Sequence, residues 1–163
     1  STLFNFRIFT LINAKVYMWK NTSQVRIMYD LERIARAIAD IERYFVDMES
    51  LNIKDANMSN EKFYSLSMLL FATLNRAFDL GNEVIKANGL GMPISYKEIF
   101  AMLGKNKLIS RELEVNLVQL AGLRNVLSHE YYDVSKEKVF DAYKKISAVR
   151  EFSKVVKKLV SKN

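Results

Sequence analysis

Two long segments of the chain carry apolar residues at helical spacing, and each is followed by a polar loop or a chain break. The first segment has Glu and Arg on one face. Its other face is apolar and consists of Leu31, Ile34, Ile38, Ile41 and Phe45. This spacing predicts a helix over about 29–51. In the second segment, 63–91, apolar side chains occur almost all round the helix as far as Phe78. We therefore expect a central, buried second helix, with Ser59 as its N-cap.

Shorter helices follow, and each is marked by a capping residue. The third is preceded by three chain breakers, Gly89, Gly91 and Pro93. It opens with the Ser-x-x-Glu capping box of residues 95–98 and is expected to end at Gly104. Ser110 and Ser135 are the expected N-caps of a fourth and a fifth helix. The pattern therefore predicts an all-α fold of about five helices.

The composition agrees with a helical protein and narrows its chemistry. The chain has 163 residues, 50% of them apolar, and one proline, which suits one compact domain. Cysteine is absent and histidine occurs once, so we expect neither disulfides nor a metal cofactor. Residues 1–27 are apolar and aromatic, but Arg7 and Lys15 interrupt them. We expect neither a signal peptide nor a membrane span there, and hence a cytoplasmic protein.

Positive charge gathers towards the C-terminal end of the chain. The formal net charge is +7, and the residues after Ser135 contribute nine Lys or Arg against three acids, a net +6. A basic helix attracts polyanions, among which RNA is a common partner. The alternative is a solvated helix face whose lysines interact favourably with the negative end of the helix dipole. The sequence leaves both interpretations open.

The predicted fourth helix has an arginine within its apolar face. That face consists of Leu113, Leu117, Leu120, Arg124, Leu127 and Tyr131. A guanidinium keeps its charge, so placing it on an apolar face is costly unless a carboxylate, a second subunit or a phosphate meets it. A purely structural interpretation pairs Arg124 with Asp79 or Glu83 of the second helix. A functional interpretation reserves Arg124 for a phosphate.

A second stripe on the same helix is small and polar, and consists of Val118, Gly122, Asn125 and His129. Glycine inside a helix costs about 1 kcal/mol relative to alanine, so Gly122 indicates close packing by another helix or a second subunit. Arg124 and His129 lie about 140° apart on an ideal helix, so one straight helix cannot direct both at one phosphate. Either the helix frays near Ser128, or two chains share a site. We expect a homodimer whose interface includes Gly122 and Asn125.

The segment RNVLSHEY, residues 124–131, resembles the Arg-x4-His-x-Tyr motif of HepT-like HEPN proteins. The similarity covers 91–134 closely and extends from about Tyr29 to about Val160. It assigns 28–163 to a HEPN domain and leaves 1–27 as an N-terminal extension. The resemblance implies an antiparallel, dimeric helical bundle that acts as a metal-independent endoribonuclease, the toxin of a HEPN/MNT toxin-antitoxin pair. The implied partners are RNA and a minimal nucleotidyltransferase antitoxin similar to MntA.

The resemblance also implies a role for each motif residue. Arg124 would stabilise the phosphate, Asn125 would support it, and His129 would act as acid and base. Tyr131 would receive AMP from the antitoxin, although Tyr132 lies next to it and only the motif spacing selects between them.

The chemistry suits RNA, whose 2′-hydroxyl is its own nucleophile. Histidine titrates near neutral pH, and the forked donors of arginine match phosphate oxygens. Two other function classes remain open. One is a HEPN module that binds RNA or nucleotide without cutting it, and the other is an accessory subunit of a nucleotidyltransferase.

Overall fold

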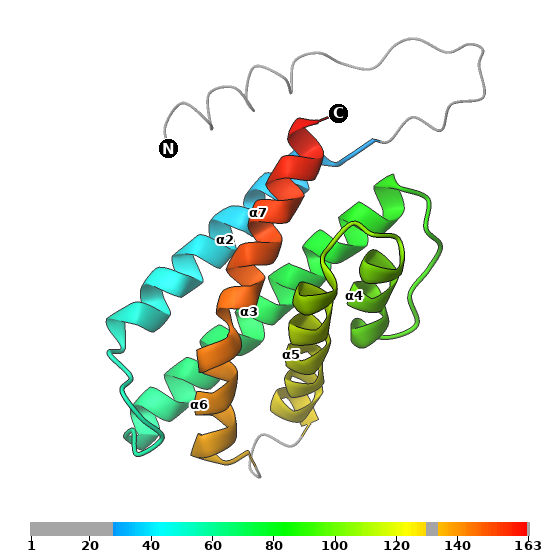
Figure 1. The fold of residues 1–163 in the computed structure, drawn as a ribbon. Coiled ribbons are helices and arrows are strands. Elements are labelled where there is room, and N and C mark those ends of the chain that lie inside the picture. The colour runs from blue at the N-terminus through cyan, green and yellow to red at the C-terminus, as the bar shows by residue number, and fades with distance from the viewer. Residues whose placement is uncertain (1–27, 130–133, 163) are drawn as a thin grey trace, which may run out of the picture.

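The computed structural model describes residues 28–129 and 134–162, which form a bundle of six α-helices (Figure 1). In chain order the helices are α2 (Leu31–Ser50), α3 (Asn60–Ala87), α4 (Tyr96–Lys105), α5 (Arg111–His129), α6 (Lys136–Lys145) and α7 (Ser147–Ser161). No strand occurs within these described ranges. The prediction of an all-α fold is confirmed.

Helix α3 is the centre of the bundle, as its apolar sequence predicts. It contacts each of the other five described helices, and its Leu66, Leu70 and Leu74 are fully buried. Helix α2 packs antiparallel to it, with the predicted apolar face directed inward (Figure 1). Helix α3 ends at Ala87, earlier than the predicted segment, because Gly89 takes a left-handed backbone conformation with φ of +61°.

The predicted caps fix where the helices begin. The side chains of Ser59 and Ser135 accept hydrogen bonds from the amides of Lys62 and Lys138, each at 3.3 Å. Ser110 accepts one from the amide of Leu113 at 3.2 Å. Replacing such a serine with alanine typically costs about 1 kcal/mol. The predicted N-caps are therefore confirmed at these three positions.

Helices α4 and α5 form a second pair that lies against α3 (Figure 1). The Ser95 hydroxyl accepts from the amide of Glu98 at 3.2 Å, as a capping box requires. The Glu98 carboxylate accepts from the amide of Ile94, one residue before the cap. Gly104 does not end α4, which continues to Lys105. Its missing side chain instead makes room for the Glu114 carboxylate of α5, which a Cβ on Gly104 would overlap.

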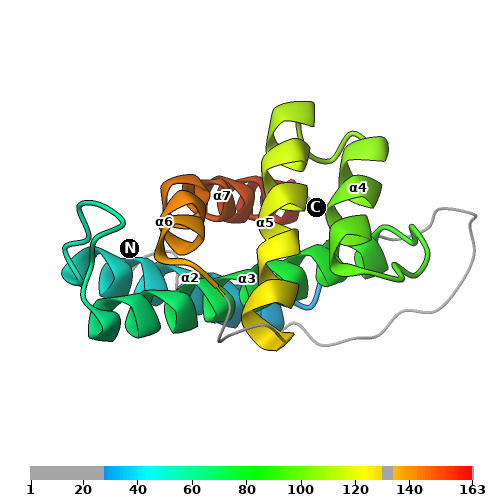
Figure 2. The same cartoon turned by 90° about the horizontal axis from the view of Figure 1, so that it is seen from below.

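The single basic helix expected after Ser135 is divided into α6 and α7. Ile146 lies between them with right-handed helical dihedral angles, and its amide bonds to the carbonyl of Tyr143, three residues back. This tighter turn bends the chain without interrupting its helical sense. Figure 2 shows α6 and α7 following one another beside α5. The expected count of about five helices therefore corresponds to six described segments.

The core extends from α3 to the last helix through a series of aromatic rings. Phe78 of α3 contacts Phe100 of α4 with ring centres 5.7 Å apart, and Phe100 contacts Phe152 of α7 edge-on at 5.6 Å. Phe100 and Phe152 are fully buried. None of the described helices is both long enough and apolar enough to cross a membrane.

Candidate functional site

The Arg124 side chain lies against two aromatic rings that the sequence analysis did not identify. Its guanidinium carbon is 4.4 Å from the ring centre of Tyr96, the first residue of α4, and 5.4 Å from that of Phe71 in α3. Arg124 is half-buried. A cation over an aromatic face is attracted by the negative charge of the ring surface. The sequence offered no signal for these contacts, because the two rings come from other helices.

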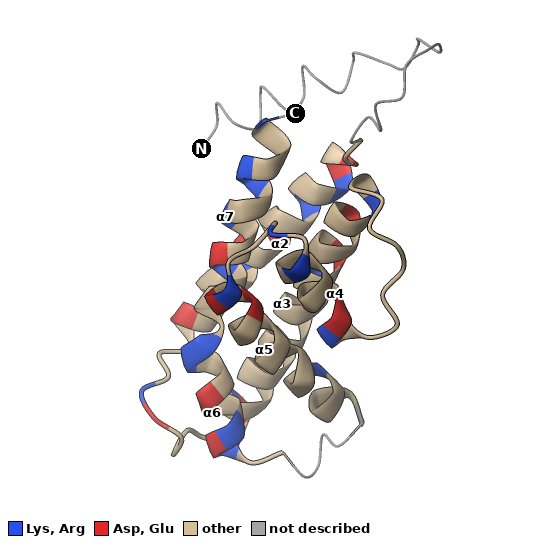
Figure 3. Cartoon of the chain, turned by 45° about the vertical axis from the view of Figure 1, so that its right-hand side comes forward, with Lys and Arg blue, Asp and Glu red and all other residues tan. Residues whose placement is uncertain are grey.

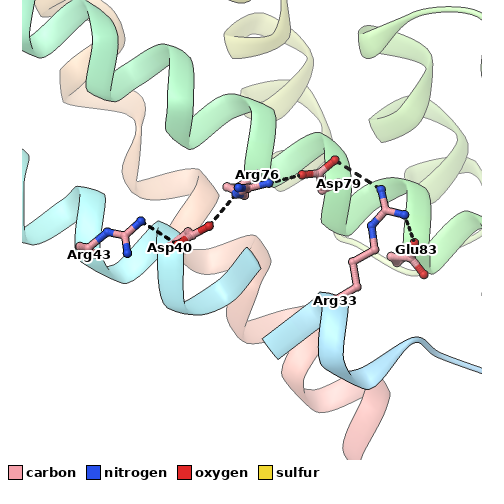
Figure 4. Close-up of polar contacts among 6 residues, drawn as sticks. All are labelled: Arg33, Asp40, Arg43, Arg76, Asp79 and Glu83. Carbon is pink, nitrogen blue, oxygen red and sulfur yellow. Dashed lines mark hydrogen bonds and ion pairs between the residues drawn. The ribbon is translucent and has the colours of Figure 1, made fainter. Parts of the chain in front are cut away.

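The alternative that pairs Arg124 with Asp79 or Glu83 is not found in the structure. Those carboxylates instead contact Arg33 of α2 and Arg76 of α3, as Figure 4 shows. Arg33 of α2 contacts Glu83 at 3.2 Å and Asp79 at 3.7 Å, and Arg76 contacts Asp79 at 2.8 Å. The two acids named in the purely structural interpretation therefore do not pair with Arg124.

The polar contacts of Arg124 are few. Its Nη1 donates a long hydrogen bond of 3.4 Å to the Ser128 hydroxyl one turn later. Its Nε is buried without a hydrogen-bond partner, and within the described residues the guanidinium has no carboxylate partner. An arginine in this state keeps its positive charge and most of its donors available for an anion.

The rest of the predicted site is only partly described. Asn125 is exposed, and its backbone carbonyl accepts a 3.0 Å hydrogen bond from Ser128. Helix α5 continues to His129, its last residue, which does not support the first of the two alternatives, a helix that frays near Ser128. Tyr131 and Tyr132 lie outside the described residues. The structure therefore places Arg124, Asn125 and His129 on one continuous helix.

Gly122 has an ordinary environment within the single chain. A Cβ at this position would lie 3.4 Å from Cε and 3.7 Å from Nζ of Lys97, the flexible end of an exposed α4 side chain. Within the described residues, no other helix of the same chain approaches Gly122 closely enough to require a glycine. The alternative, a second subunit at Gly122, stays a prediction.

The basic C-terminal segment combines paired and exposed charges. Arg150 contacts Glu42 and Glu49, each at 3.3 Å, and Lys144 contacts Asp141 at 2.6 Å. This ion pair lowers the pKa of the Asp141 carboxyl. Lys154 and Lys158 are exposed. Figure 3 shows the blue residues of α6 and α7 interrupted by red ones, so this surface is mixed in sign and is a weaker candidate for RNA binding than Arg124.

A charged pocket elsewhere in the fold is explained by internal ion pairs. It lies between α2 and α3, and its lining includes Arg33, Arg36, Arg76 and Asp79. Each of these arginines contacts a carboxylate, and the hydrogen bond with Asp79, followed by that with Asp40, raises the pKa of Arg76. Among the described residues, no group of three or more His, Cys, Asp or Glu is placed to hold a metal ion.

Comparison with known proteins gives one consistent family. The family model described as "Ribonuclease HepT-like" matches residues 34–158. The mRNA nuclease HepT of Shewanella oneidensis is 27% identical over 109 residues, which cover 67% of this chain and 78% of that protein. The tRNA nuclease HepT of Aphanizomenon flos-aquae is 29% identical over 122 residues, which cover 75% of this chain and 80% of that protein.

Solved structures give the same fold. The tri-AMPylated HEPN toxin of Shewanella oneidensis, in complex with its MNT antitoxin, has a TM-score of 0.70 and 25% identity. That alignment covers 80% of this chain and 98% of the toxin. The cytosolic protein YutE of Bacillus subtilis has a TM-score of 0.74 at 20% identity, covering 83% of this chain and 94% of YutE. The chain therefore belongs to the HepT-like ribonuclease family.

Proposed function

We propose that this protein is a metal-independent endoribonuclease, the toxin of a toxin-antitoxin pair. Its relatives include proteins named as nucleases of mRNA and of tRNA, and a related toxin is found with an MNT antitoxin. The observation that carries the proposal is the state of Arg124. Arg124 is half-buried, its guanidinium contacts no carboxylate among the described residues, and the residue lies on the helix that ends at His129.

The proposed reaction uses the RNA as its own nucleophile. The His129 imidazole takes the proton of the 2′-hydroxyl while the 2′-oxygen bonds to phosphorus. The bond from phosphorus to the 5′-oxygen breaks, and a proton returned to that oxygen completes the 5′-hydroxyl product. The other product ends in a 2′,3′-cyclic phosphate. Arg124 stabilises the negative charge that develops on the phosphoryl oxygens, with Asn125 as a polar neighbour.

We propose that the active form is a homodimer. Because α5 is helical throughout from Arg124 to His129, the two residues keep their separation of about 140° around the helix axis. A single straight helix cannot direct both side chains at one phosphate. Two copies related by symmetry can bring the arginine of one copy towards the histidine of the other. The exposed Asn125 and the small Gly122 fit an interface of this kind.

The proposed partner is a minimal nucleotidyltransferase similar to MntA, which would silence the toxin by transferring AMP to Tyr131. The AMPylated state of the related Shewanella toxin supports this regulation. The two nuclease relatives are named for different RNA classes, so we propose RNA in general as the substrate. We place this activity in the cytoplasm, where mRNA and tRNA are both found.

Expression in a bacterial host tests the proposal. The wild type, His129→Ala and Arg124→Ala would be induced while growth and total RNA integrity are followed. We expect the wild type to arrest growth and fragment RNA, and both variants to lose these effects. Arg36→Ala is a matched control, because Arg36 is exposed on α2 and pairs only with Glu32 among the described residues. RNA binding without fragmentation by the wild type would instead identify a non-catalytic HEPN module.

A further inference from the structure

Aromatic rings hold Arg124, whereas carboxylates hold every other arginine in the described part of the chain. Ion pairs with acids are made by Arg33, Arg36, Arg43, Arg76, Arg111 and Arg150. Arg150 is the closest comparison, because its guanidinium lies 4.0 Å from the Phe45 ring centre but also contacts two carboxylates. Arg124 has the rings of Tyr96 and Phe71, and no carboxylate among the described residues contacts it.

This difference has a direct chemical consequence. A carboxylate would occupy the donors of a guanidinium and cancel its charge, and both are needed to bind a phosphate. An aromatic face attracts the same cation through its quadrupole but accepts no strong hydrogen bonds in the plane of the guanidinium. Rings can therefore hold Arg124 in one orientation while its outer donors stay available. Of the two rings, Tyr96 is the nearer: its centre lies 4.4 Å from the guanidinium carbon of Arg124, and that of Phe71 lies 5.4 Å away.

The Tyr96 ring is itself fixed to the core of the protein. It stacks on Phe78 of α3 with ring centres 4.3 Å apart and an interplanar angle of 25°. Phe78 is 2% exposed and continues the aromatic series to Phe100. The backbone of Tyr96 is set by Ser95, the N-cap of α4. Tyr96 is therefore a rigid surface between the hydrophobic core and the arginine.

We propose that Tyr96 is a positioning residue for RNA cleavage. Its ring orients the guanidinium of Arg124 towards the substrate phosphate without neutralising its positive charge, as a carboxylate would, and Phe71 is a second contact. This inference rests on the proposed ribonuclease function, but the orientation of Arg124 can be measured separately from cleavage. Tyr96 acts through Arg124 and needs no contact with RNA.

Kinetics on a short RNA substrate give the first test. Tyr96→Leu removes the ring, and we expect kcat to fall by about 10- to 100-fold with a smaller change in KM, because a misdirected group loses transition-state stabilisation. Tyr96→Phe keeps the ring and should retain most of the activity. Tyr44→Leu is the control, because Tyr44 also lies beneath an arginine, Arg43, but on α2, which makes no contact with α5.

A double-mutant cycle separates positioning from general damage to the fold. If Tyr96 acts through Arg124, Tyr96→Leu should lower the residual kcat of Arg124→Ala by less than twofold, far less than it lowers that of the wild type. Equal losses in both backgrounds would overturn the proposal. Thermal unfolding of each variant checks stability. Phe71→Leu provides a second variant, with a smaller expected loss, should Tyr96→Leu not fold.

Nuclear magnetic resonance measures the orientation directly. In ¹⁵N-labelled protein, the Nε–H signal of Arg124, assigned by its loss in Arg124→Lys, should be shifted by the ring current of Tyr96. We expect the shift to persist in Tyr96→Phe and to disappear in Tyr96→Leu. An unchanged signal in Tyr96→Leu would overturn the positioning role. A signal that moves in Tyr96→Leu while kcat stays unchanged would overturn the link between this orientation and cleavage. A wild type without nuclease activity would refute the proposed ribonuclease function but not the positioning of Arg124 by Tyr96.

Discussion

The Lys97 side chain of α4 lies beside Gly122 of α5, with Cε 3.4 Å from where a Cβ on residue 122 would stand. The neighbour is the flexible end of an exposed lysine, which can move aside at small cost. Nothing in the described part of the single chain therefore requires a glycine at this position, although glycine weakens the helix by about 1 kcal/mol relative to alanine. A second copy of the chain packed against this position would explain why residue 122 is a glycine.

Gly122→Ala should separate the stability of the monomer from that of the dimer. We expect the isolated chain to gain about 0.5–1 kcal/mol of folding free energy from the better helix former. We also expect weaker association, because an added methyl on each copy would separate the two surfaces. Light scattering over a dilution series, with thermal unfolding at the lowest concentration, measures both. A monomeric wild type with full nuclease activity would contradict the composite site.

Gly81→Ala is the matched substitution, and we expect it to lower the stability of the folded chain, whereas Gly122→Ala should raise it. Gly81 is buried in α3, and a Cβ there would overlap Cγ2 of Ile99 in α4. Because Ile99 is 3% exposed and packed in the core, the overlap should cost about 1–3 kcal/mol. Thermal or urea unfolding measures this loss. A stability equal to that of the wild type would show that α4 can shift away from α3.

The helices and their caps could be predicted from the sequence because the signals are local. Ser59, Ser95, Ser110 and Ser135 each stand within three residues of the amide that they cap. Periodicity likewise identified the buried face of α2 and the central position of α3. The boundary between α6 and α7 was missed because Ile146 keeps helical dihedral angles and neither Gly nor Pro marks the bend.

The surroundings of Arg124 could not be predicted, because they depend on how three helices meet. The leucines of the predicted apolar face of α5 are buried, among them Leu113, Leu117 and Leu120, whereas its last member, Tyr131, lies outside the described residues. For the one charged residue in that face, the sequence left a carboxylate, a second subunit or a phosphate as possible partners, and ion pairing with Asp79 or Glu83 was the purely structural alternative. In the folded chain Arg33 pairs with Glu83 and Arg76 pairs with Asp79. Arg124 instead contacts the rings of Tyr96 and Phe71.

Cleavage should continue in the presence of a chelator. The chain has no cysteine and one histidine, and attack by the 2′-hydroxyl needs proton transfer and charge stabilisation, which His129 and Arg124 can supply. Incubation of purified protein with RNA in excess EDTA should give fragments that end in a 2′,3′-cyclic phosphate, identified by mass spectrometry. Activity that appears only after addition of a divalent ion would contradict this mechanism.

Tyr131→Phe should keep much of the nuclease activity but escape chemical silencing. The phenol is needed neither for proton transfer nor for phosphate stabilisation, so toxicity should persist in the variant. If the chain continues as a helix beyond His129, residues 124 and 131 share a face, and AMP on Tyr131 would bring phosphate charge towards the Arg124 guanidinium. The modification would then inhibit by imitating the RNA phosphate as well as by blocking the site.

Growth with and without a co-expressed nucleotidyltransferase measures this effect, and intact-mass analysis reports AMP transfer. Tyr132→Phe is the matched control, because the same hydroxyl is removed one residue away. We expect Tyr132→Phe to be modified and silenced like the wild type, and Tyr131→Phe to remain toxic and unmodified. The reverse pattern would move the acceptor to Tyr132. Silencing of both single variants without AMP transfer would mean that the antitoxin acts by binding, since steric cover of Arg124 needs no covalent change.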